Sequence, residues 1–468
     1  MTSDPPCPHE RGHITDSRLS GNCYATEASR RIFCDTCRFQ RWLGIEAALA
    51  LTQADLGIVP AEAAAAIAAA AHLGPVDPAA VDREARLTGH TLVGLLRVLA
   101  RAAGPESGQY VHFGATTQDI QDTAQSLELR DVLDQLQPQL DQLLLGLTEL
   151  TERHAHTLAL GRTHAQPALP ISFGLKPASW IDELLRHRER LAQLRERALV
   201  VQLFGAAGTM AGFGGRGPAL LEGFAKRLGL QAPVVGWHVA RDRVAEFTTV
   251  LAMLCGTLAR IADEIRTLSR PEFGEISEEW QSGLVCSSTM PHKRNPERSE
   301  QVAVLAQLAA AQLGPAWASM TGEHERDARS WRLEWAFVPD VSHYTLAALE
   351  TTLAIVGDLR VHEERLLANL AAVADQVMSE RLMLALGRKI GKQHAYQEMY
   401  ELVHRAQDLG HPIRLALQER TDWFTPGELA TLLDPAGYLG CSAQLAHRTA
   451  AHARTALGTA PDSHRPGT

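Results

Sequence analysis

The sequence contains few aromatic residues and no excess of cations. Phe, Trp and Tyr together make up only 5% of the 468 residues, whereas Ala and Leu are abundant. Since Ala and Leu are strong helix formers, this bias predicts an all-α protein. Lys and Arg number 45 against 54 Asp and Glu, so the formal net charge is −9. A net negative charge argues against a general nucleic-acid-binding protein.

Signals for membranes, secretion and metal binding are also lacking. No uninterrupted apolar run is long enough to span a bilayer, and residues 1–13 are too polar for a secretory signal. We therefore predict a cytoplasmic protein without a membrane partner, whose seven cysteines are thiols. One CxxC pair, Cys34 and Cys37, falls inside a predicted helix and has no second pair to complete a zinc site. We predict no metal and no cofactor.

Apolar residues recur three and four apart over most of the chain, which predicts helices. The longest predicted helices cover about 119–156, 177–201, 239–269, 296–313 and 341–358. Helices of this length predict a bundle, and no strand ladder is expected. We predict a helical N-terminal domain (1–109), a central long-helix domain with the active-site loops (110–363) and a helical C-terminal domain (364–468) with a disordered tail.

Three polar segments interrupt the predicted helices, at 110–119, 161–167 and 282–296. In the third, Pro291 and Pro296 exclude a continuous helix. Between them lie Lys293 and Asn295, a cation and an amide suited to holding a carboxylate. Together with the preceding serines they are the parts of a site that binds an anion and moves a proton.

The three segments carry a family resemblance. SSTMPHKRNP resembles the signature of the fumarase/aspartase superfamily, and HFGATTQD and GRTHAQP resemble its other two active-site segments, in the same order. The resemblance implies an all-α, fumarase/aspartase-like fold with a central bundle of very long helices shared in a homotetramer. It further implies composite active sites from three subunits, a small dicarboxylate substrate, and anti β-elimination on a substituted succinate to release fumarate.

Roles for individual residues follow from the same resemblance. Ser287 matches the catalytic base, His164 the general acid, and Glu300 the glutamate that pairs with this histidine. The residues that match substrate-binding positions are His112, Thr116, Thr117, Gln166, Arg241, Lys293 and Asn295. The elimination creates a doubly charged aci-carboxylate, which preorganised donors stabilise best. Cys286 departs from the glycine that the family usually has before the two serines, which leaves the path of the loop open.

The branch of the superfamily is less defined. A muconate cycloisomerase of the family carries tryptophan where this chain has His164. An adenylosuccinate lyase binds phosphate through Ser and Arg, where this chain has Trp331 and Trp335. We therefore predict a carbon–nitrogen lyase, specifically a nitrosuccinate lyase that releases nitrite. The alternatives are adenylosuccinate lyase, 3-carboxy-cis,cis-muconate cycloisomerase and an inactive structural relative, although the intact Ser287 and Lys293 argue against the last.

Overall fold

The computed structural model of the chain describes residues 12–279, 289–290 and 292–459. The described chain is mostly helical, as predicted, with four short strands. The long helices are α2 (Asp35–Asp55), α6 (Thr117–Arg153), α7 (Leu175–Ala198), α9 (Asp242–Leu268), α10 (Glu297–Ala311), α12 (Ala328–Gly357), α16 (Lys392–Asp408) and α19 (Ser442–Ala456).

The remaining elements are shorter. The helices are α1 (Glu27–Phe33), α3 (Ala61–Ala70), α4 (Pro78–Thr88), α5 (Thr91–Ala102), α8 (Gly217–Leu228), α11 (Leu313–Ala318), α13 (Glu363–Ala372), α14 (Ala374–Val377), α15 (Ser379–Ile390), α17 (Ile413–Gln418) and α18 (Pro426–Leu432). The 3-10 helices are η1 (Ile14–Asp16), η2 (Gly21–Cys23), η3 (Ser107–Tyr110), η4 (Ala211–Arg216) and η5 (Pro435–Tyr438). The strands are β1 (Leu158–Thr163), β2 (Gln166–Ser172), β3 (Ile276–Ser277) and β4 (Arg360–Val361).

The chain divides into two compact units. Unit 1 comprises Met1–Leu140, His187–Ala259 and Gln301–Thr351, and unit 2 comprises Asp141–Arg186, Arg260–Glu300 and Thr352–Thr468. Helices α6, α7, α9 and α12 each contribute residues to both units. The predicted domain boundaries at residues 109 and 363 follow a different principle, the order of motifs along the chain, and they stay a prediction.

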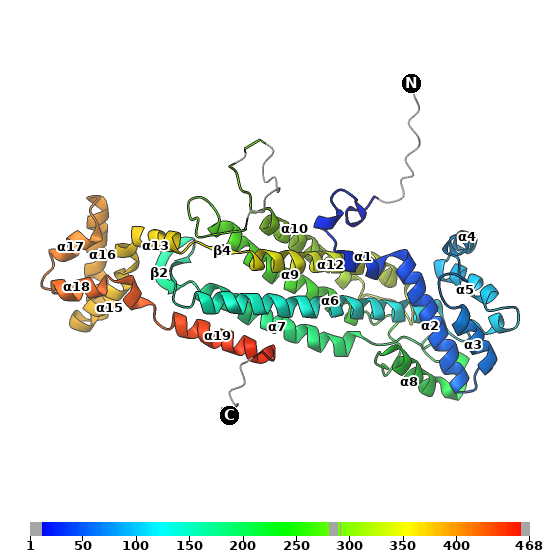
Figure 1. Cartoon of the computed structure of the whole chain (residues 1–468). Helices are drawn as coiled ribbons and strands as arrows, with labels where there is room; N and C mark the ends of the chain where they lie inside the picture. The colour runs from blue at the N-terminus through cyan, green and yellow to red at the C-terminus, as the bar shows by residue number, and fades with distance from the viewer. Residues whose placement is uncertain (1–11, 280–288, 291, 460–468) are drawn as a thin grey trace, which may run out of the picture. The chain divides into compact units, whose positions relative to one another are not determined.

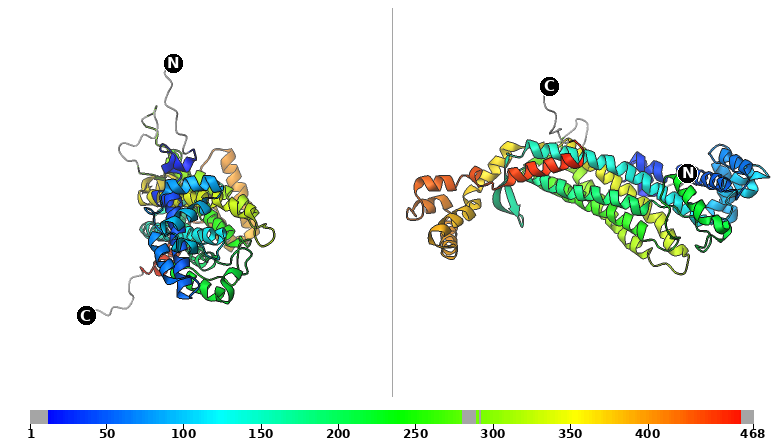
Figure 2. Two further views of the ribbon diagram at one scale, coloured as in Figure 1. Left: turned by 90° about the vertical axis from the view of Figure 1, so that its right-hand side faces the viewer. Right: turned by 90° about the horizontal axis from the view of Figure 1, so that it is seen from below.

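The core of unit 1 is built by parts of α6, α7, α9 and α12, which lie side by side (Figures 1 and 2). Leu133, Leu194, Leu251 and Leu349 come from these four helices in turn, and none of them is exposed to solvent. Each helix can bury such residues because apolar residues three and four apart fall on one of its faces. The long periodic runs in the sequence therefore predict both the helices and the face that each buries.

Helix α9 has the length and apolar composition that could cross a membrane. The apolar window of this helix is 67% buried inside the protein, as in the core helix of a soluble protein. It is the one such helix among the residues that the structure describes.

Unit 2 contains two antiparallel strand pairs and a helical cluster. Strand β1 pairs with β2, and β3 pairs with β4. Helices α15 to α18 surround a separate apolar core that includes Leu382, Met399, Leu417 and Trp423 (Figure 1). The predicted absence of strand pairing is therefore wrong for this unit, although the all-α class holds.

Two predicted boundaries are wrong for identifiable reasons. Helix α12 begins at Ala328, because Asp327 Oδ1 accepts a hydrogen bond from the backbone N–H of Arg329 at 2.9 Å and so caps the helix. Residues 328–335, predicted as irregular, are therefore helical. Cys34 interrupts the helix that was predicted to contain it and separates α1 from α2. Its backbone is extended, and its Sγ accepts a hydrogen bond from the backbone N–H of Cys37 at 3.4 Å. The predicted tail beyond residue 459 lies outside the described residues.

Candidate active site

The first predicted segment begins helix α6 in unit 1. Asp119 is fully buried, and its carboxylate accepts hydrogen bonds from the backbone N–H groups of Thr116 at 3.0 Å, Phe204 at 3.0 Å and Gly205 at 2.9 Å. A carboxylate in the first turn also suits the positive end of the helix dipole. Asp119 therefore fixes the start of α6 against the 204–205 loop.

Arg326 joins the hydroxyl groups of this segment. Its guanidinium donates to Thr116 Oγ1 at 2.6 Å, to Thr117 Oγ1 at 3.3 Å and to Gln118 Oε1 at 3.0 Å. The planar fork of an arginine presents its N–H groups in a fixed geometry to several acceptors, whereas a lysine presents three N–H groups from a single nitrogen on a flexible chain. The two predicted threonines are thus brought together, with a cation between them.

His112 lies in the same segment with a left-handed backbone, φ 61°. Its Nδ1 lies 2.7 Å from Glu46 Oε1, and Glu46 is only 1% exposed. Burial lowers the pKa of His112, but the charge of Glu46 and its hydrogen bond outweigh burial, so the pKa is raised overall. His112 is therefore more readily protonated than an ordinary histidine.

His90 lies near Arg326 and His112. Burial lowers the pKa of His90 first, and the positive charges of Arg332, Arg326 and His112 lower it further. Two arginines, Arg326 and Arg332, and His112 thus act on His90 with their positive charge, beside the two threonine hydroxyls. Such an arrangement favours an anionic ligand.

Arg241 is placed differently from its prediction. It is 1% exposed, and all five of its N–H groups are used inside unit 1. They donate to Asp122 (2.9 and 3.0 Å), Glu334 (2.7 Å and a shorter contact) and the carbonyl of Trp237 (3.4 Å). This arrangement gives Arg241 a structural role and does not support the predicted contact with a substrate.

The second predicted segment is the turn of the β1–β2 hairpin in unit 2. Thr163 pairs with Gln166, so His164 and Ala165 form the two-residue turn, with φ 49° and 61°. Positive φ at both positions is what a type I′ hairpin turn requires. His164 and Gln166 are both exposed in the single chain. The hairpin is anchored by Arg162, which donates to the fully buried Glu275 at 3.0 Å.

The third predicted segment lines a cavity of about 720 Å³ in unit 2. Lys293, Asn295 and Glu300 all contribute to its wall, so the structure brings these three predicted residues together. The other charged residues of the wall are Arg266, Arg270, Arg294 and Glu278. Glu278 is engaged by the N–H and the hydroxyl of Ser299, at 3.0 and 2.6 Å, so cations dominate the cavity. Ser287 and Cys286 lie outside the described residues.

Comparison with known proteins identifies the family. Residues 23–310 match the family described as "Lyase", and residues 375–449 match "Adenylosuccinate lyase C-terminus". The chain is 38% identical over 435 residues to the N-acetyl-S-(2-succino)cysteine lyase of Dickeya dadantii, which covers 92% of this chain and 96% of that protein. It is 36% identical over 437 residues to the adenylosuccinate lyase of Methanothermobacter thermautotrophicus, with 91% and 96% covered.

A solved structure agrees in fold. The 3-carboxy-cis,cis-muconate lactonizing enzyme of Pseudomonas putida superposes with a TM-score of 0.85 at 34% identity, covering 92% of this chain and 98% of that one. The chain belongs to the fumarase/aspartase superfamily. The predicted family is therefore confirmed, and the protein is an enzyme of this lyase superfamily.

Some site residues of this superfamily member escape sequence reasoning. Arg326 is visible only as part of a phosphate-binding pattern that the chain does not complete, and nothing in the sequence connects it to Thr116. Glu46 lies in an apolar helix 66 residues before His112. His90 carries one weak signal: it precedes the first residue of α5, yet its side chain forms no capping hydrogen bond there.

Proposed function

We propose that this superfamily lyase removes a substituent from a 2-substituted succinate by anti β-elimination and releases fumarate. The observation that carries the proposal is the cavity of unit 2, where Lys293 and Asn295 lie beside Glu300 in a wall dominated by cations. A succinate has two carboxylates, and the reaction adds a further negative charge to one of them. Fixed cations and amide donors stabilise that charge as it forms.

The predicted residues have distinct tasks in this reaction. Ser287 takes the proton from the carbon next to the carboxylate, once nearby amides and cations have activated it. Lys293 and Asn295 hold the carboxylate that becomes the aci-carboxylate, and His164, paired with Glu300, assists the leaving group. Thr116, Thr117, His112 and Gln166 supply further donors. These assignments are proposals that rest on the family motifs.

We further propose that the active sites are composite and the enzyme a homotetramer. His164 and Gln166 are exposed on the hairpin turn of the single chain, as expected of residues that act in another subunit's site. Mixing tests this directly. Co-expression of inactive His164→Gln with inactive Lys293→Met should restore activity, because some mixed sites then contain neither substitution. Absence of restoration in confirmed mixed oligomers would refute composite sites.

The leaving group is proposed to be a thiolate or an amine rather than a nucleotide. Trp331 and Trp335 contact each other edge to face at 4.9 Å between ring centroids, and they stand where phosphate ligands are expected in adenylosuccinate lyase. Indole donates one N–H and carries no charge. The similarity to a succinocysteine lyase supports a succinylated thiol as the first substrate class. Nitrosuccinate stays a prediction from sequence alone, since none of the relatives named above bears that activity in its name.

The test measures fumarate by its ultraviolet absorbance with a panel of substrates. The panel contains N-acetyl-S-(2-succino)cysteine, S-(2-succino)cysteine, adenylosuccinate and nitrosuccinate. We expect turnover of a succinylated thiol, a loss of at least about a hundredfold in Ser287→Ala, and little change in the control Ser179→Ala on α7. Release of fumarate from adenylosuccinate and from no other substrate of the panel would refute the proposed substrate class.

A further inference from the structure

The cavity of unit 2 is larger than a succinate requires. Its volume is about 720 Å³, whereas pockets of about 300–1,000 Å³ enclose drug-sized ligands. A succinate has only four carbon atoms, and in the proposed reaction Lys293 and Asn295 hold one of its carboxylates. The rest of the wall, which includes the end of α9, strand β3 and His362, is therefore available to the group that leaves.

Arg270 is a cation of this wall that has no partner among the residues that the structure describes. It lies two residues beyond the end of α9 and is exposed. The end of the helix does not occupy its side chain, because the carbonyl of Leu268 accepts from the backbone N–H of Glu275 at 3.0 Å. Arg266, by contrast, is paired with Asp263 at 3.2 Å. The guanidinium of Arg270 is thus available to a guest.

The carboxylates of the same wall do not neutralise its cations. Glu278 forms an ion pair with Arg298 at 3.1 Å, and Arg298 is not part of the wall. Glu300 is then the one remaining carboxylate of the described wall, against the side chains of Arg270 and Lys293. The wall keeps an excess of positive charge and favours an anionic guest.

Ser277 and His362 add a neutral donor to this wall. Ser277 lies on β3 and His362 directly follows β4, and the backbone N–H of His362 donates to the carbonyl of Glu275 at 2.9 Å. Ser277 Oγ lies 2.9 Å from His362 Nε2. A hydroxyl and a neutral imidazole have one O–H and one N–H between them, and their mutual hydrogen bond uses only one of the two. The pair therefore keeps one donor for a guest.

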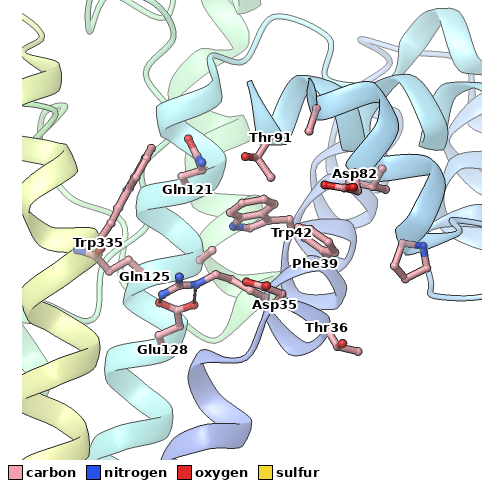
Figure 3. A pocket seen from close by; sticks show the side chains of 15 residues that line it. Asp35, Thr36, Phe39, Trp42, Asp82, Thr91, Gln121, Gln125, Glu128 and Trp335 are labelled. Carbon is pink, nitrogen blue, oxygen red and sulfur yellow. Dashed lines mark hydrogen bonds and ion pairs between the residues drawn. The ribbon is translucent and has the colours of Figure 1, made fainter. Parts of the chain in front are cut away.

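The cavity of unit 1 shows a wall without such an excess of cations (Figure 3). Its volume is about 620 Å³, and Arg38 is the one cation among its lining residues. Arg38 donates to both oxygens of the buried Glu128, at 2.8 and 3.2 Å. An anionic group therefore finds no uncompensated cation in that wall.

We infer that Arg270, together with the Ser277–His362 pair, binds a carboxylate carried by the leaving group, so that the preferred substrate has three carboxylates. The inference rests on the proposed elimination from a 2-substituted succinate. A carboxylate suits this place because a guanidinium can hold it with two parallel N–H bonds. The elimination itself is unchanged: the carbon–heteroatom bond breaks, its electrons leave with the heteroatom, and the removed proton goes to the base.

Two substrates that differ in one carboxylate test this inference. N-acetyl-S-(2-succino)cysteine carries a carboxylate on its leaving group, whereas N-acetyl-S-(2-succino)cysteamine has a hydrogen in that place. We expect kcat/KM to be at least about tenfold higher for the first substrate, and Arg270→Met to abolish most of that preference. Because Arg270 is exposed and unpaired, its replacement should leave the fold intact.

Arg260→Met is the matched control for these kinetics. Arg260 lies on α9, is paired with Glu183 at 2.7 Å and is not part of the cavity wall, so this variant should retain the preference. Equal kcat/KM for the two substrates in the wild type, or an unchanged preference in Arg270→Met, would overturn the inference.

A binding measurement separates this inference from the proposed function. The probes are 2-(2-carboxyethyl)succinate and 2-propylsuccinate, in which a carbon atom replaces the departing heteroatom so that neither can be eliminated. Calorimetry follows their binding to the full-length wild-type protein and to Arg270→Met. We expect the tricarboxylate to bind about tenfold more tightly than the dicarboxylate in the wild type only. If this selectivity is seen but no succinate is turned over, the proposed function fails. If fumarate is released but the selectivity is absent, the inference about Arg270 fails.

Discussion

Replacing Arg241 by Met is expected to destabilise the protein rather than to weaken substrate binding. Arg241 lies between Asp122 and Glu334, and the side chains of all three are inaccessible to solvent. Met has a similar volume but no charge, so both carboxylates would remain buried without their cation. Breaking a buried ion pair from one side costs about 3–5 kcal/mol.

The remaining contacts place the expected loss at the lower end of that range. Asp122 still accepts from the Gln118 amide at 3.1 Å and the Gln202 amide at 3.3 Å, and Glu334 still accepts from the Gln125 amide at 2.7 Å. We therefore expect a loss of about 3 kcal/mol in the free energy of unfolding. Burial already raises the pKa of Glu334, against the opposing charge of Arg241. Without that charge the pKa rises further, so the deficit should shrink as the pH falls and the carboxylates become protonated.

Urea denaturation measures this effect, with Arg243→Met, two residues further along the chain, as the matched control. Arg243 donates to the carbonyl of Arg197 at 3.0 Å and is not fully buried, so its replacement should change stability by less than about 1 kcal/mol. The fraction of the Arg241→Met variant that remains folded should have the KM of the wild-type enzyme. A variant of unchanged stability with a sharply raised KM would show instead that Arg241 contacts the substrate.

Three further perturbations test the site. Glu46→Gln removes the charge that raises the pKa of His112. A histidine whose pKa is higher in the folded than in the unfolded protein stabilises the fold at a pH below the unfolded-state pKa, and this stabilisation is lost as the pH rises through the folded-state pKa. The deficit in melting temperature of the variant should therefore be larger near pH 6 than near pH 9. An equal deficit at both pH values contradicts this. Arg326→Lys keeps the positive charge but loses the planar guanidinium that contacts Thr116 and Thr117, so kcat/KM should fall by about ten- to a hundredfold. The control Arg329→Lys should leave kcat/KM unchanged. Equal kcat/KM values in the two variants would show that Arg326 does not belong to the site. Asp119→Ala leaves three backbone N–H groups without an acceptor and should lower the free energy of unfolding by about 2–4 kcal/mol in urea denaturation, and a wild-type midpoint would contradict that role.

The helices could be predicted because their signal is local. Apolar residues three and four apart specify both α6 and α9 within a few residues of their ends. The hairpin around His164 could not, because its strands are short and its turn is His–Ala rather than a glycine-containing pair. The predicted start of helix α12, near residue 341, is too late, because the helix begins at Ala328 and includes Pro339.

The site residues also divide into those that a local motif predicts and those that depend on residues distant in sequence. Lys293, Asn295 and Glu300 lie close together in sequence, so their shared cavity could be expected from one motif. The role of Arg241 depends on carboxylates 119 residues before it and 93 residues after it. No local pattern distinguishes an arginine that binds substrate from one that is neutralised by distant partners, and only the folded structure separates the two.

The central claim is that the enzyme releases fumarate from a 2-substituted succinate, and proton NMR of the reaction tests it most directly. With S-(2-succino)cysteine and its N-acetyl form, the wild-type enzyme should produce the fumarate vinyl signal and an equal amount of free thiol. Ser287→Ala should produce both at least about a hundredfold more slowly. Formation of a lactone, or the absence of fumarate from every 2-substituted succinate supplied to the folded enzyme, would contradict the claim.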